Sequence, residues 1–146
     1  MVLRMRAQLF DTIEKEAEWN NVEPQAAIAV MMAESGGNPG AIGDDGFSIG
    51  LWQLHEAGAG AHMTDDDRIS IVRSTAVAIA WLGELHDLLE NWPHAWSAYN
   101  QGLQGFRDNG VTFTAEYVSR VQDIYERLCA EDFARVEDLS GWVEWA

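Results

Sequence analysis

Glu34 is the residue in this sequence whose position best suits acid chemistry. It ends an apolar stretch, residues 25–33, that is expected to be helical, and Gly36 and Gly37 follow almost directly. A carboxyl group there would lie on the wall of a cleft with hydrophobic backing, which raises its pKa. A glutamic acid protonated near neutral pH can give its proton to a departing sugar oxygen, as glycosidic cleavage requires. Because most glutamates at helix ends are solvated surface residues, this feature alone does not decide the chemistry.

Other chemistries lack their usual motifs. The four histidines are scattered through the chain, without the paired spacing of a zinc site. Ser35 has no histidine and aspartate partners in motif form, and the neighbouring glycines lack the lysine of a phosphate-binding loop. The sequence therefore predicts no metal and no cofactor.

The elements that must position Glu34 are expected to be mostly helical. Apolar residues recur with a helical period over residues 3–19, and Pro24 suits the first turn of the helix that ends at Glu34. Residues 36–50 contain six glycines and a proline, which predicts a loop or an irregular hairpin, with a short strand over residues 49–54. Thr64 is a good N-cap for a long apolar helix that should reach about residue 89.

Two further helices are expected toward the C-terminus. They should span residues 94–100 and 116–128, with a polar, glycine-containing connection between them. Residues 131–146 are acidic and contain Trp142 and Trp145, so they could form a packed helix or an extension that docks on a partner. The 146 residues fit one compact domain, spanning 1–146 and including this C-terminal extension.

The composition excludes several classes of partner and fold. Net charge is −15, which argues against binding to nucleic acid or to anionic membranes. No segment approaches the ~20 apolar residues of a membrane span, and the N-terminus resembles a charged helix more than a signal peptide. Cys129 is the only cysteine, so no internal disulfide can form, and we expect it to be a buried apolar residue. Seven Trp, five Phe and three Tyr exceed what a core this small needs, so some are expected in a surface groove.

Four segments together resemble the superfamily of lytic transglycosylases and goose-type lysozymes. In chain order they are ESGGNP at 34–39, GLWQL at 50–54, AYNQG at 98–102 and YVSRV at 117–121. The family pattern is a catalytic Glu followed by Ser, a Gly-Leu-Met-Gln segment, an Ala-Tyr-Asn-Ala-Gly segment and a late Tyr-Val helix. The resemblance implies a mainly α, lysozyme-like fold, in which a helical lobe and a small hairpin lobe flank a glycan-binding groove. It also implies cleavage of the glycan strands of bacterial peptidoglycan.

Carried onto this chain, the resemblance makes Glu34 the general acid. Gln53 and Asn100 match positions that hydrogen-bond substrate, and Tyr99 and Tyr117 match positions around the catalytic carboxyl. Ser35, which follows the catalytic Glu, and Trp52 are placed with them among the substrate-binding residues. Two alternatives stay open at this point, because Tyr99 could instead be a core residue and Asn100 could simply cap its helix.

The outcome of the reaction depends on a second carboxylate. Asp44 lies nine residues before Gln53, a spacing similar to that of goose-type lysozymes, in which an aspartate holds the water that attacks the anomeric carbon. Alternatively, Asp44 and Asp45 form an ordinary turn with Gly46. Without a positioned water, Glu34 would act as acid and then as base, and the 6-hydroxyl of muramic acid would attack to give a 1,6-anhydro product. His55 occupies a second goose-type aspartate position, which weakens the hydrolase alternative.

The chain departs from the family pattern at two positions in these segments. Trp52 replaces the usual Met, which is expected to give a larger, flatter apolar wall for sugar stacking. Gln101 replaces the usual Ala beside Gly102 and is expected to alter the groove edge.

The segment Leu54-His55 resembles phage-associated members of the superfamily. We therefore expect a monomeric phage lysin or virion-associated enzyme, made in the cytoplasm without a signal peptide, that acts at the bacterial cell wall. Virion or lysis proteins are its possible partners besides the glycan strand. The competing hypothesis is a non-catalytic glycan-binding or virion structural module that retains the fold, and the intact Glu34 argues against it.

Overall fold

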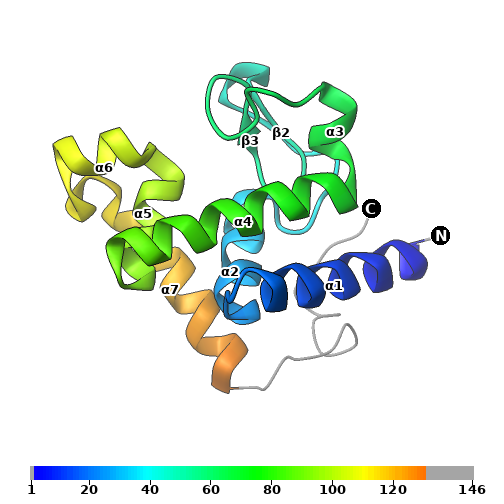
Figure 1. Ribbon diagram of the computed structural model, residues 1–146, viewed down its shortest axis with the longest axis horizontal. Coiled ribbons are helices and arrows are strands. Elements are labelled where there is room, and N and C mark those ends of the chain that lie inside the picture. The colour runs from blue at the N-terminus through cyan, green and yellow to red at the C-terminus, as the bar shows by residue number, and fades with distance from the viewer. Residues whose placement is uncertain (1, 131–146) are drawn as a thin grey trace.

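The computed structural model describes residues 2–130 of the chain, with side chains from residue 7 onward. Within this part, seven α-helices account for most of the chain, and a small antiparallel sheet lies to one side of them (Figure 1). The helices are α1 (Val2–Trp19), α2 (Pro24–Ser35), α3 (Asp65–Ile69), α4 (Ile71–Leu89), α5 (Trp92–Gln101), α6 (Leu103–Asn109) and α7 (Ala115–Ala130). The predicted mainly α, lysozyme-like fold with a small hairpin lobe is confirmed. The predicted C-terminal extension, residues 131–146, lies outside the described residues.

Helix α2 is the buried centre of the helical lobe. Pro24 occupies its first turn, where a missing backbone N–H costs nothing, and every residue from Ala26 to Met31 is buried. It packs along α7, while α1 packs along α4 (Figure 1). Gly36 ends α2 in the left-handed conformation, with φ of 64°, and its N–H donates to the carbonyl of Met32. A helix with this apolar sequence therefore delivers its last turn, including Glu34, to the edge of the core.

The small sheet has three two-residue strands in the order β1 (Ile42–Gly43), β2 (Ser48–Ile49) and β3 (Leu54–His55). Gly43 pairs with Ser48, and Ser48 pairs in turn with His55. The prediction of one strand over residues 49–54 was wrong, because Gly50, at φ of 89°, begins a turn that separates β2 from β3. A Cβ on Gly50 would lie 2.2 Å from the carbonyl oxygen of Arg68, so the close approach to α3 requires glycine there.

The segment after the sheet confirms the predicted cap but not the single long helix. Thr64 caps α3 in a reciprocal capping box with Asp67. The chain then leaves helical geometry at Ser70, whose side chain caps the separate helix α4 by accepting from the N–H of Arg73. Arg68 on α3 is buried and donates to the carbonyls of Phe47 and Leu54, which ties the small sheet to the helices.

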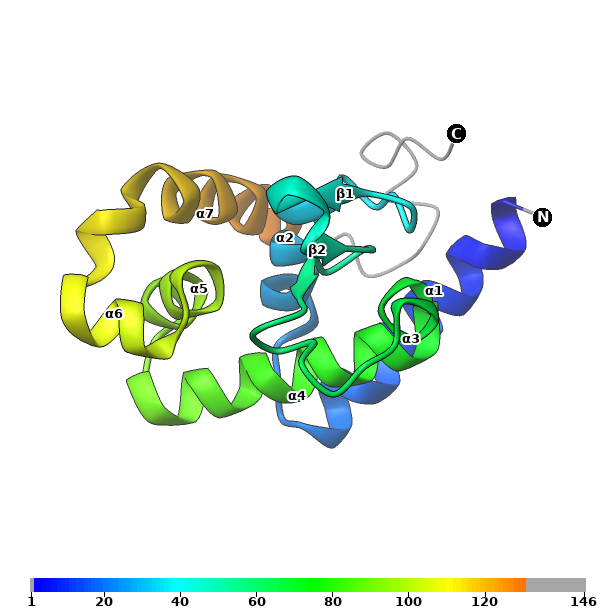
Figure 2. The ribbon, with the colours of Figure 1, turned by 90° about the horizontal axis from the view of Figure 1, so that it is seen from above.

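The region after α4 contains one helix that the sequence did not predict. Helix α5 begins at Trp92, slightly before the predicted start, and Gly102 ends it. The predicted polar connection instead forms α6, which lies between two glycines of positive φ, Gly102 at 85° and Gly110 at 77°. Figure 2 shows α5 and α6 at one end of the molecule, with α4 running from them toward the small sheet and α3.

Several predictions about single residues and segments can be assessed here. Cys129 is exposed, so the expectation of a buried cysteine was wrong, because it faces outward from the last turn of α7. Trp52 and Trp96 are fully buried core residues. Within residues 2–130, none of the helices combines the length and apolar character needed to cross a membrane.

Candidate active site

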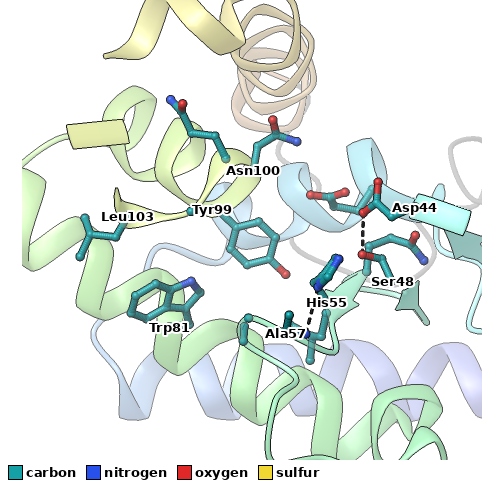
Figure 3. A pocket seen from close by; sticks show the side chains of 15 residues that line it. Asp44, Ser48, His55, Ala57, Trp81, Tyr99, Asn100 and Leu103 are labelled. Carbon is teal, nitrogen blue, oxygen red and sulfur yellow. Dashed lines mark hydrogen bonds between the residues drawn. The ribbon is translucent and has the colours of Figure 1, made fainter. Parts of the chain in front are cut away.

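A cleft of about 600 Å³ opens between the small sheet, α4 and the α5–α6 corner. Figure 3 shows Tyr99 near its middle, with Asp44 and Ser48 on one side and Trp81 and Leu103 on the other. The cleft is lined by Glu34, Asp44, Ser48, Gln53, Leu54, His55, Ala57, Gly58, Ala59, Trp81, Tyr99, Asn100, Gln101, Gly102 and Leu103. Five of the residues predicted from the sequence, from four separate segments, therefore meet in one cavity.

The carboxyl group of Glu34 lies where the last turn of α2 meets this cleft. Burial raises its pKa from the ordinary value of 4.5 to about 7, as the apolar backing predicted. A hydrogen bond from the phenol of Tyr117 and the positive charge of Arg120 lower this pKa, and the negative charge of Asp44 raises it. The result is an acid whose pKa lies near neutral pH.

Tyr117 connects Glu34 to helix α7. Its hydroxyl donates to Oε2 of Glu34 at 2.9 Å, and its side chain is only 8% exposed. Burial, and after it the charge of Glu34, raise the pKa of this phenol well above its usual value, so it remains a donor. The guanidinium of Arg120 lies 5.7 Å from the centre of the Tyr117 ring. Arg120 was quoted in the YVSRV segment without a role, and its charge turns out to act on Glu34.

Asp44 lines the same cleft from the sheet side. Its Oδ2 accepts a hydrogen bond of 2.6 Å from the hydroxyl of Ser48, so the carboxylate is held at β2 (Figure 3). Asp44 and Asp45 both have positive φ, 50° and 56°, and form a tight 3-10 turn with Gly46. The prediction that Asp44 and Asp45 form a turn with Gly46 is thus compatible with a place for Asp44 on the cleft wall, because Asp44 is the first residue of that turn.

Gln53, Tyr99 and Asn100 also line the cleft. The amide nitrogen of Gln53 donates to the carbonyls of Ala41 and Gly50, which leaves its Oε1 for other contacts. Tyr99 donates its hydroxyl to the carbonyl of Trp52 at 2.7 Å, so it braces the cleft wall. Asn100 is exposed, and its side chain forms no hydrogen bond within residues 2–130. The alternative that Asn100 caps its helix was wrong, because Gly102 is the residue at which α5 ends.

Three predicted substrate-binding residues are absent from the cleft lining, namely Tyr117, Trp52 and Ser35. Trp52 has no exposed surface, and its indole N–H donates to Thr75 inside the core, so the prediction that it stacks on sugar was wrong. The larger side chain fills the interior where Met is usual. Ser35 is absent from the cleft lining, since its hydroxyl donates to the carbonyl of Met31 and accepts from the N–H of Gly37. It secures the end of α2 instead of facing a ligand.

The cleft also contains residues that the sequence analysis did not place there. Trp81 belongs to a long apolar helical pattern that is typical of core residues. Its position on the cleft wall follows only from the packing of distant segments around it. His55 was noted for its position but not as a wall residue. Its Nδ1 accepts from the N–H of Ala57 at 3.0 Å, which fixes the ring against the turn that follows β3. Among the described residues, no group of three His, Cys, Asp or Glu is arranged to hold a metal ion.

The sequence model of the family described as "Transglycosylase SLT domain" matches residues 11–116. The chain belongs to this family. The match contains Glu34, Asp44, Gln53 and Asn100, and it ends one residue before Tyr117. Membership in the SLT family indicates a peptidoglycan-cleaving activity of the lytic transglycosylase class. No curated protein matches the chain.

Proposed function

We propose that this SLT domain cleaves the β-1,4 bond between N-acetylmuramic acid and N-acetylglucosamine in peptidoglycan, with Glu34 as the general acid. The observation that carries the proposal is a carboxyl group, with a pKa of about 7, on the wall of a cleft of about 600 Å³. A general acid is most effective when its pKa lies near the working pH, because enough of it is protonated and its proton is still readily given up.

In the first half of the reaction, Glu34 gives its proton to the glycosidic oxygen. The bond from this oxygen to C1 of muramic acid breaks, and the leaving sugar departs with a free hydroxyl. The carboxylate that remains accepts the hydrogen bond from Tyr117, and the charge of Arg120 favours its ionised state. Both groups come from α7, so the packing of α7 against α2 positions them.

In the second half, we propose that the Glu34 carboxylate removes the proton from the 6-hydroxyl of the same muramic acid. The freed oxygen attacks C1 and closes a 1,6-anhydro ring, no water is consumed, and Glu34 returns to its protonated state. This sequence needs one carboxyl group only, and it is the chemistry of the class that the family match indicates.

Asp44 supports a second candidate function, inverting hydrolysis. It lies in the same cleft, the Ser48 hydroxyl holds its carboxylate, and its charge acts on Glu34. An inverting enzyme needs two carboxyl groups roughly 6.5 to 9.5 Å apart with a water between them. In that case Asp44 would take a proton from the water, and the product would have a reducing muramic acid end.

We assign substrate contacts to two amide side chains in the cleft. Asn100 is exposed and has both amide groups free for an N-acetyl or hydroxyl partner. Gln53 has its oxygen free while its nitrogen is held by backbone carbonyls, which fixes the direction in which that oxygen accepts. Polar groups placed at fixed positions in a cleft determine the orientation of the ligand and the specificity for it.

Mass spectrometry of the fragments released from purified peptidoglycan tests the proposal. Four proteins are compared: wild type, Glu34→Gln, Asp44→Asn and Asp45→Asn. Asp45 is the matched control, because it is the neighbouring exposed aspartate of the same turn and does not line the cleft. Circular dichroism of each variant shows that it is folded before its products are compared.

The expected result is anhydromuramic ends from wild type, Asp44→Asn and Asp45→Asn, and no fragments from Glu34→Gln. Reducing muramic ends that disappear in Asp44→Asn but persist in Asp45→Asn would establish the hydrolase instead. Absence of fragments from every protein, with retained binding to peptidoglycan, would favour a non-catalytic glycan-binding module. Full activity of Glu34→Gln would overturn the assignment of the acid.

A further inference from the structure

The two sides of the cleft differ in chemistry. On the sheet side are the polar groups of Asp44, Ser48 and His55, whereas Trp81 and Leu103 present apolar surface on the side of α4 and α6 (Figure 3). Tyr99 lies between these two sides (Figure 3). A glycan bound along the cleft would therefore place one sugar near the carboxylates and another against the apolar end.

From this arrangement we infer that Trp81 is the platform on which a sugar ring of the glycan stacks, in a subsite beside the catalytic carboxyl. The inference rests on the proposed function and adds a specificity-determining residue to it. The occupant is an N-acetylhexosamine ring, whose axial C–H groups form a flat apolar face. Hydroxyl and N-acetyl groups at the rim of the same ring provide acceptors for a single N–H donor.

Trp81 is the tryptophan whose surroundings fit this role. Trp52 and Trp96 are fully buried, Trp92 forms a tilted ring contact with His86 at 4.1 Å between ring centres, and Trp19 does not line the cleft. Of the tryptophans within residues 2–130, Trp81 alone lines the cleft. The aromatic surface that sequence analysis expected in the groove is therefore provided by α4 and not by Trp52.

Trp81 is packed against the helical lobe without being fully buried. It packs against the small cluster of Leu85, Ala95 and Ala98, which fixes it on helix α4. It is nevertheless partly exposed, and its N–H donates no hydrogen bond within the part of the chain that the structure describes. A rigid aromatic face with a free donor at its edge matches a ring that has an apolar face and a polar rim.

The α6 side of the subsite is fixed by Gln101, the residue that replaces the usual Ala of the family. Its amide donates to the hydroxyl of Ser97 on α5 and to the carbonyl of Gly110, which follows α6. The first bond lies within α5, and the second joins the C-terminal end of the glycine-flanked α6 to α5. Leu103, at the start of α6, packs against the same apolar cluster as Trp81. Gln101, which itself lines the cleft, therefore belongs to the wall of the sugar subsite.

Binding and turnover of Trp81→Ala and Trp81→Phe test the inference, with Trp19→Ala as the matched control. Trp19 is a tryptophan of 86% exposure at the end of α1, outside the cleft. The probe for binding is chitohexaose, titrated calorimetrically into each variant combined with Glu34→Gln so that no cleavage intervenes. The substrate for turnover is soluble, uncross-linked glycan strand. Its cleavage is measured with the Trp81 and Trp19 variants that retain Glu34.

Trp81→Ala should weaken chitohexaose binding about tenfold and raise KM by a similar factor, with kcat changed less than about twofold. Trp81→Phe keeps a flat face without the N–H and should lose about threefold. The fluorescence change on adding chitohexaose should disappear in Trp81→Phe and persist in Trp19→Ala. If Trp81→Ala is unfolded by circular dichroism, Trp81→Phe and the fluorescence titration still decide the question.

Unchanged binding, KM and fluorescence response in Trp81→Phe would overturn the subsite. A loss confined to kcat would equally overturn it, because that pattern would show distortion of the catalytic carboxyl. Failure of the proposed function itself would appear differently, as full cleavage by Glu34→Gln with Trp81 intact. The two failures are therefore distinguishable.

Discussion

Replacement of Glu34 by Gln should make the stability of the protein depend less on pH. Burial holds the pKa of Glu34 at about 7 in the folded protein, against an ordinary value of 4.5. Between these two pH values the unfolded chain loses the proton of Glu34 while the folded chain retains it. The free energy of unfolding therefore contains a favourable contribution that is complete below pH 4.5 and is lost as the pH rises to about 7.

The size of this effect follows from the displacement of the pKa. At 1.36 kcal/mol for each pKa unit, a change from 4.5 to about 7 corresponds to about 3 kcal/mol. A neutral amide of nearly the same shape keeps a polar group at the position of the carboxyl but has no ionisation to suppress. The stability of Glu34→Gln relative to wild type should consequently rise by about 3 kcal/mol between pH 4 and pH 8.5.

Urea unfolding of both proteins at a series of pH values measures this difference, in which the titration of every other group cancels. Glu14→Gln, on the exposed face of α1, controls for the loss of a carboxylate elsewhere. The reasoning is refuted if the difference between Glu34→Gln and wild type is the same at pH 5 and pH 8. A difference that changes in the opposite direction would show that the partners of Glu34, and not its burial, dominate its ionisation.

Two further predictions concern the surroundings of the site. In Tyr117→Phe, Glu34 loses the hydrogen bond that lowers its pKa, so the fall in activity on the alkaline side should move about one pH unit upward in a pH–rate profile; an unchanged or downward-shifted profile would contradict this. Gly50→Ala would place a Cβ 2.2 Å from the Arg68 carbonyl at a φ of 89° and should destabilise far more than Gly36→Ala, which has open space at a φ of 64°. Thermal unfolding should show a loss of about 1 kcal/mol for Gly36→Ala and several times that for Gly50→Ala, and equal losses would contradict the close contact.

The parts of the fold that the sequence predicted well are those set by local chemistry. A helical apolar period, Pro24 in a first turn and the capping box at Thr64 all depend on residues close together in the chain. Helix α6 was missed because Gly105 and the flanking glycines resemble a loop, whereas the helix depends on bonds that Gln101 makes across the α5–α6 corner. The break at Ser70 was missed because an apolar pattern continues through it.

In the candidate site, too, positions set by local motifs were predicted, whereas the burial of single side chains was not. Glu34, Asp44 and Asn100 were predicted to face one groove, and the structure brings them to one cleft. Trp52 was predicted to line the groove because it lies in a motif, but it is buried, whereas Trp81, in an apolar helix, lines the cleft. The direction of each side chain depends on long-range packing. A motif identifies a position along the chain, but burial is decided by elements that are distant in sequence.

The opposing influences on the pKa of Glu34 come from different parts of the fold, and their balance suits the proposed role of this carboxyl group as acid and then base. Burial at the end of α2 and the charge of Asp44 on the sheet side raise its pKa, while Tyr117 and Arg120 on α7 lower it. The C-terminal end of a helix also disfavours a negative charge, since the last backbone carbonyls point toward it. An acid with a much higher pKa would be a poor proton donor, and one with a much lower pKa would be a poor base afterwards. A pKa of about 7 suits both halves of the proposed anhydro-forming reaction. Without Tyr117 and Arg120 of α7, burial would keep Glu34 protonated, and it would be a poor base in the second half.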